Sequence, residues 1–225
     1  MVRGAAPWHD GGMADSPAPR TSGLLVVAAA VTALVTVVRL VGELQGWDPE
    51  RFSTEVGGGL LGVDIAWLVP LFGFLFGRRL ALIGARPPFV AGFFVPMFGV
   101  AAIVAAVALV NSRCQGEDLR IWGHYLVNGA PVVGLLALFA WPRACVVNLA
   151  YAVMARAPVM IVQYLDAQNP TWQTHYGKVH PGLPPMTTDE RLWLLTRTQL
   201  GLWIPFTVLL AGAFASLGAA TVRKA

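Results

Sequence analysis

The segment 144–166 is long and apolar enough to cross a lipid bilayer, yet it carries Arg156 near its middle and Pro158 just beyond. A cationic side chain at that depth costs about 2.5–3.5 kcal/mol even on the scales derived from membrane insertion. We therefore expect the guanidinium to face protein or water, and other helices must surround it. This segment alone predicts an integral membrane protein in which several helices pack around a buried charge.

Five further segments come close to the ~20 residues that a membrane-spanning helix requires. The predicted spans are about 23–45, 60–78, 89–110, 124–141, 144–166 and 188–220, and they form one domain, 23–222. Residues 1–22 are rich in Gly, Pro, Ala and Ser and have no apolar period, which predicts a mobile tail.

Prolines lie inside five of these spans, and each removes one helical hydrogen bond and can kink its helix. They are Pro70, Pro96, Pro131, Pro158 and Pro205. The expected fold is an all-α integral membrane protein: a six-transmembrane-helix bundle with several proline-kinked helices. A structured extracytoplasmic loop is expected between the fifth and sixth helices.

The composition excludes most soluble classes. Only 12% of the residues are charged and 56% are hydrophobic, whereas a soluble domain carries about 25% charged residues. The net charge of +4 comes from basic residues placed between apolar runs, which fits a lipid bilayer as partner and argues against nucleic-acid binding. Cys114 and Cys145 lie in different parts of the chain without a CxxC motif, so no disulfide framework or cofactor is predicted.

The distribution of Lys and Arg predicts the orientation. Eight of them fall on the side of the two termini and five on the opposite side. The positive-inside rule then places both termini in the cytoplasm. We expect a multi-pass protein of a bacterial-type inner (plasma) membrane.

The charges inside the spans are expected to share one level of the bilayer. A rise of ~1.5 Å per residue puts Arg39, Glu43, Asp64, Arg156 and Arg197 in its outer half, although they come from four helices. We expect Glu43 to pair with Arg39 or Arg156, and Asp64 with Arg197 or Arg156. Two interpretations stay open, because such charges either form a polar pocket or only set the register of the helices.

The connection between the last two spans is the most distinctive polar segment. Five aromatic or basic side chains crowd into nine of its residues: Trp172, His175, Tyr176, Lys178 and His180. Rigid polar loops above a cavity often carry binding residues. His175 and His180, with His124 on the same side, are weak candidates for a metal site, because their spacing matches no familiar ligand motif.

The leading functional hypothesis is binding or transport of an anionic solute or an anionic lipid headgroup in an outward-facing polar pocket. Arg156 would be the central ligand, with Arg197 and Arg39 secondary, Glu43 and Asp64 in the same cluster, and His175 and Tyr176 in the lid. The alternative is an accessory subunit of a larger membrane complex, for example an energy-transducing one, that contacts other membrane subunits. A membrane enzyme with a histidine-bound metal is less favoured, and the absence of hydrolase motifs argues against an enzyme in general.

Overall fold

The computed structural model describes residues 21–57 and 62–223, and within those ranges the chain forms helices and no strands. Six of the helices are long and apolar enough to cross a membrane. This confirms the all-α, six-helix architecture. The predicted tail, except for its last two residues, lies outside the described residues, as do residues 60 and 61 of the second predicted span.

The elements are long helices and a few short helical turns, and the two longest connections follow α1 and α5. They are α1 Thr21–Leu44, η1 Ile65–Trp67, α2 Leu68–Leu82, α3 Phe89–Arg113, α4 Gly116–Ala140, α5 Pro142–Gln168, η2 His175–Gly177, α6 Thr188–Thr198, η3 Gln199–Trp203 and α7 Ile204–Ala220. The last three form one continuous span in which η3 is a π-helical segment. A capping box at Thr187 and Glu190 begins this span.

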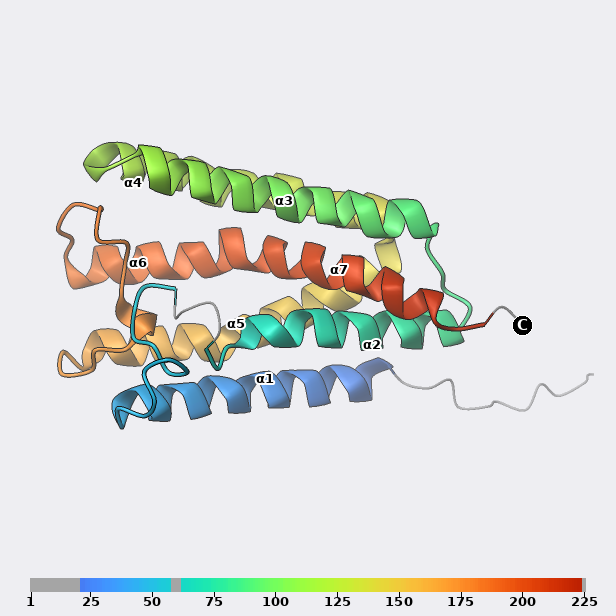
Figure 1. Ribbon diagram of the computed structural model, residues 1–225, viewed down its shortest axis with the longest axis horizontal. Helices are drawn as coiled ribbons and strands as arrows, with labels where there is room; N and C mark the ends of the chain where they lie inside the picture. The colour runs from blue at the N-terminus through green and yellow to red at the C-terminus, as the bar shows by residue number, and fades with distance from the viewer. Residues whose placement is uncertain (1–20, 58–61, 224–225) are drawn as a thin grey trace, which may run out of the picture.

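The start of α1 and the end of α7 lie at the same end of the bundle (Figure 1), as an even number of spans requires. We call this the proximal end. The opposite, distal end carries the α1–α2 connection and the α5–α6 loop, residues 169–187.

Helix α7 is the centre of the bundle and packs on α2, α3, α4 and α5. Its closest neighbour is α2, and glycines on both helices allow the approach. A Cβ at Gly77 would overlap the carbonyl group of Ala215, and a Cβ at Gly218 would overlap that of Phe74. Small residues at such contacts let two backbones approach closely, which is a common way for membrane helices to associate.

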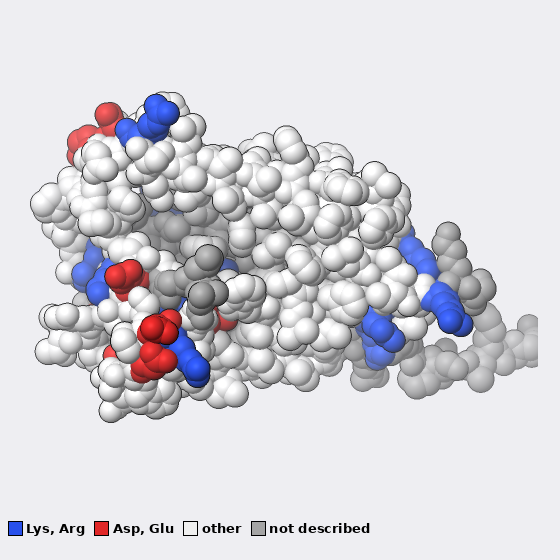
Figure 2. Space-filling model, viewed as in Figure 1, with Lys and Arg blue, Asp and Glu red and all other residues white. Residues whose placement is uncertain are grey.

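The outer surface between the two ends is apolar. Figure 2 shows Asp and Glu toward the distal end and Lys and Arg at both ends, with an uncharged band between the two ends. Large apolar side chains such as Phe98, Val132 and Phe139 are exposed in that band. In water such a surface would be unstable, so the helices are those of a polytopic protein in a lipid bilayer.

Candidate functional site

A cavity in the distal half results from the late start of the second span. That span runs over Ile65–Leu82 rather than the predicted 60–78, so it leaves the distal half to the connection that precedes it. In Figure 1, α2 begins about halfway along the bundle, whereas α1 and α3 continue to the distal end. The cavity left there has a volume of about 360 Å³, and the space-filling view shows this face hollowed below α3 (Figure 2).

The walls of this cavity differ in chemistry. The side formed by α1, α5, η3 and the distal connections is polar, with Arg39, Asp64, Arg156, Gln163, His175, Lys178 and Gln199. The side formed by α3, α4, α6 and η3 is mostly apolar, with Val107, Val110, Leu126, Leu194, Leu195 and Leu202, and its polar members are Asn111, Arg120 and Thr198. An amphipathic lining of this kind suits a ligand that has both an apolar part and a polar group.

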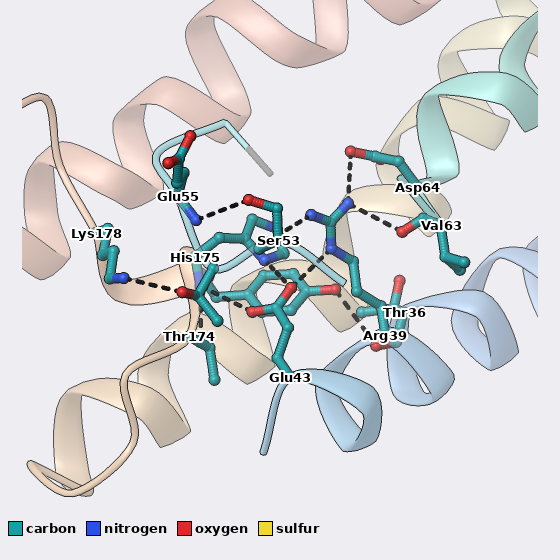
Figure 3. A network of polar contacts seen from close by, with 12 residues as sticks. Thr36, Arg39, Glu43, Ser53, Glu55, Val63, Asp64, Thr174, His175 and Lys178 are labelled. Carbon is teal, nitrogen blue, oxygen red and sulfur yellow. Dashed lines mark hydrogen bonds and ion pairs between the residues drawn. The ribbon is translucent and has the colours of Figure 1, made fainter. Parts of the chain in front are cut away.

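Arg39 is the centre of a paired cluster at the distal end of α1. Its Nε donates to Glu43 Oε1 at 2.8 Å and its Nη1 to Asp64 Oδ2 at 3.0 Å. The same guanidinium donates to the carbonyl groups of Val63 and Ser53 at 2.9 and 3.3 Å. Two carboxylates and two carbonyl oxygens thus compensate one cation, and they tie the α1–α2 connection to α1 (Figure 3).

These contacts decide the two pairing predictions. The pairing of Glu43 with Arg39 is confirmed, because one helical turn separates them and places both on one face. The pairing of Asp64 with Arg197 or Arg156 is wrong, since Asp64 binds Arg39. The reason is that Asp64 does not lie inside a helix: it precedes η1 and caps it by accepting from the N–H of Ala66.

The α5–α6 loop is held against this cluster. His175 donates its backbone N–H to Glu43 Oε2 at 2.8 Å, and its Nδ1 lies against Glu43 Oε1 (Figure 3). The hydroxyl of Thr174 donates to Asp166 at the end of α5, and Lys178 Nζ donates to Thr54 Oγ1 at 3.3 Å. The loop is therefore structured, and its side chains cover the cavity from the distal side.

Tyr176 joins the loop to the middle of α1. Its hydroxyl donates to the carbonyl oxygen of Thr36 at 3.3 Å, and its ring is buried. Burial raises the pKa of the Tyr176 hydroxyl far above its ordinary value, so it remains a hydrogen-bond donor at physiological pH.

Arg156 lies on the same cavity but in very different surroundings. It is 6% exposed, and its Nη2 donates to Thr207 Oγ1 at 3.1 Å while its Nη1 is 3.5 Å from Gln199 Oε1. Its guanidinium carbon lies 5.0 Å from the ring centroid of Trp203, in cation–π range. Within residues 21–57 and 62–223, no carboxylate lies within ion-pair distance of Arg156, and its Nε has no hydrogen-bond partner.

The neutral partners of Arg156 come from one face of the last span. Gln199, Trp203 and Thr207 follow one another at intervals of four residues through η3 into α7. The π-helical turn precedes Pro205, which has no N–H for the helical hydrogen bond. Gly201 in this turn lies so close to α4 that a Cβ would overlap the carbonyl of Val127. Sequence reasoning did not assign these partners, although their four-residue spacing is visible.

Gln163 is a second polar residue on this cavity with a hydrogen-bonding atom that has no partner. It lies two helical turns beyond Arg156 on α5, is 3% exposed, and its Oε1 has no hydrogen-bond partner. The seven-residue spacing between Arg156 and Gln163 is the signal that places both on one face.

Arg197 lies apart from this site. Its Nη2 is 2.7 Å from His124 Nδ1 and 3.5 Å from Asn128 Oδ1, both on α4. It lines a separate groove outside the cavity. The other predicted site residues, Arg39, Asp64, His175 and Tyr176, line the cavity with Arg156, and Glu43 lies directly behind them as the partner of Arg39.

The three candidate metal ligands are not brought together. His175 contacts Glu43, His124 contacts Arg197, and His180 accepts from the N–H of Gly182 at 3.1 Å. In the part of the chain that the structure describes, no three His, Cys, Asp or Glu side chains converge to form a metal site.

Comparison of the chain with protein-family models, with curated proteins and with solved structures finds no match.

Proposed function

We propose that the protein binds, or transports, a molecule with an anionic group in the distal cavity, and that Arg156 is the residue that holds this group. The anion is either a free solute or the headgroup of a lipid, since a phosphate or carboxylate offers the same chemistry in both. We further propose a plasma-membrane location with cytoplasmic termini, so that the cavity faces outward.

The observation that carries the proposal is the contrast between the two buried arginines. Arg39 has two carboxylate partners at 2.8 and 3.0 Å and needs no further anion. Arg156 has two neutral oxygen partners and an aromatic ring. A buried cation that no carboxylate contacts is costly in a membrane, and such residues mark ligand or ion pathways.

The cavity as a whole has the charge that an anionic ligand requires. Four cationic side chains line it. Arg39 is paired with Glu43 and Asp64, and Arg120 with Glu117, so Arg156 and Lys178 supply its positive charge. The Nε of Arg156 is buried and has no hydrogen-bond partner among the described residues, and a guanidinium can bind a phosphate or carboxylate through two parallel hydrogen bonds. His175 and Tyr176 would cover the bound group, because both line the cavity and belong to the α5–α6 loop at the distal end.

The test is isothermal titration of the full chain, purified in a nonionic detergent, with methyl phosphate and with octyl phosphate. We expect Arg156→Gln to lower the affinity for octyl phosphate about tenfold or more, because one charge-assisted hydrogen bond contributes about 1.5–3 kcal/mol. The matched control is Arg191→Gln, at the start of the same last span and outside the cavity. Equal affinities of the wild type and Arg156→Gln for both phosphates would refute the proposal.

A specific surface feature favours the accessory-subunit alternative. Ala101, Ala105 and Ala108 are exposed along one side of α3, where a partner helix would approach closely. Mass measurement in a mild detergent tests it: co-purification with a second membrane protein in fixed stoichiometry favours a subunit, and a particle of the mass of this chain alone speaks against one.

A further inference from the structure

A second groove lies outside the bundle, between α4 and α6, at the level of the aromatic side chains near the distal end. Its volume is about 400 Å³. Tyr125 and Trp193 line it and are 62% and 64% exposed. Trp and Tyr are enriched where a membrane meets water, because one end of each side chain is apolar and the other polar. The groove therefore lies where the headgroups of the neighbouring leaflet would be.

Arg197 is the central cation of this groove. Its hydrogen-bonding partners are His124 at 2.7 Å and Asn128 at 3.5 Å, and its guanidinium carbon lies 5.8 Å from the ring centroid of Trp193. The one carboxylate in the lining belongs to Glu190, which accepts from the N–H and hydroxyl of Thr187 at 2.8 and 2.9 Å. Among the described side chains, none forms an ion pair with Arg197.

The groove and the Arg156 cavity share part of their lining. Arg120, Gly123, Val127 and Leu194 line both. Helix α4 packs on α3, α5, η3 and α7, whereas α6 reaches it mainly through the side chain of Arg197, so the backbones of the two helices leave a seam at the distal end. Gly123 lies in this seam, and a Cβ added there would meet no atom within 4 Å. An alkyl chain can pass at this point because no side chain occupies it.

From this geometry we infer a second anion site, centred on Arg197, that holds the headgroup of a single-chain anionic lipid from the adjacent leaflet. The α4–α6 seam is the lateral route by which such a lipid reaches the Arg156 cavity. The lateral route to the Arg156 cavity rests on the proposed function. With this route the ligand is a membrane amphiphile rather than a free solute, which agrees with the apolar wall of the cavity.

The experiment is native mass spectrometry of the full chain with lysophosphatidate, which carries one acyl chain and a phosphate. We expect two bound molecules for the wild type and for the control Arg191→Gln. Arg197→Gln and Arg156→Gln should each bind one, and the double variant none. Two bound molecules in Arg197→Gln would overturn the second site, whereas two in Arg156→Gln would overturn only the proposed function.

The route is tested with Gly123→Phe, which places a ring in the seam, where an added Cβ meets no atom within 4 Å. We expect transfer of lysophosphatidate from vesicles to the Arg156 cavity to slow about tenfold or more, while the binding of methyl phosphate from solution is unchanged. An unchanged transfer rate would overturn the lateral route. Methyl phosphate binding to Arg197 as tightly as lysophosphatidate would overturn the assignment of this site to a lipid. Retention of lysophosphatidylcholine in equal amount would show that charge does not select the ligand and would likewise overturn it.

Discussion

Replacing Arg39 by Gln tests whether the cluster of Arg39, Glu43 and Asp64 stabilises the fold, in contrast to Arg156, which is proposed to bind the ligand. The change removes the cation that compensates two carboxylates. The side chain of Glu43 has an exposed fraction of 0%, and after the change only His175 remains to compensate it. Removing one member of a buried ion pair typically costs about 3–5 kcal/mol, since the other charge stays buried. Asp64 adds less to this cost, because its side chain is 27% exposed and water can replace Arg39.

The expected magnitude is therefore a loss of about 3–5 kcal/mol in the free energy of unfolding for Arg39→Gln. The double variant Arg39→Gln, Glu43→Gln should lose less than the single variant, because it no longer buries an isolated carboxylate. The α1–α2 connection should also loosen, since Arg39 holds the carbonyl groups of Ser53 and Val63.

The assay is reversible unfolding in mixed micelles of nonionic detergent and sodium dodecyl sulfate, followed by circular dichroism. Proteolysis within the α1–α2 connection gives a second readout. A loss below about 1 kcal/mol for Arg39→Gln, or a double variant as unstable as the sum of the two single variants, would refute the account of a coupled buried cluster.

Three further predictions use the same unfolding assay. Arg156→Gln should change the free energy of unfolding by less than about 1 kcal/mol, because it removes both a costly buried charge and its neutral hydrogen bonds; a loss like that of Arg39→Gln would make Arg156 structural. Gly77→Ala should cost about 1–3 kcal/mol or more by overlap with α7, whereas Gly129→Ala, with open space at its Cβ, should be neutral or stabilising. Because the pKa of Tyr176 is raised on folding, the unfolded chain loses this proton first, so stability should fall as the pH rises above about 10. Tyr176→Phe should remove that part of the loss of stability at high pH. Identical pH profiles of stability for the wild type and Tyr176→Phe would contradict this prediction.

Much of the architecture follows from the sequence because membrane insertion depends on local apolar length. The six spans are continuous apolar runs, and each can be recognised without knowledge of the others. The level of the charges also follows, since a helix advances by a constant ~1.5 Å per residue. Arg39, Asp64 and Arg156 accordingly line one cavity in the distal half.

What the sequence could not determine is the rotation of each helix about its axis and the point where α2 begins. Rotation places Arg197 outside the bundle and Arg156 inside it, although both lie in the distal half. The start of α2 places Asp64 before the helix, within reach of Arg39.

The sequence by itself therefore determined the class of the protein, its number of spans and the depth of its charges, because these depend on length and hydrophobicity along one segment at a time. Only the tertiary structure decided which charges are paired, where the cavity lies and that Arg156 has neutral partners. Those properties depend on side-chain contacts between segments far apart in the chain, such as Arg156 with Thr207 and Glu43 with His175. Such contacts are set by how the helices pack around α7, which no single segment encodes.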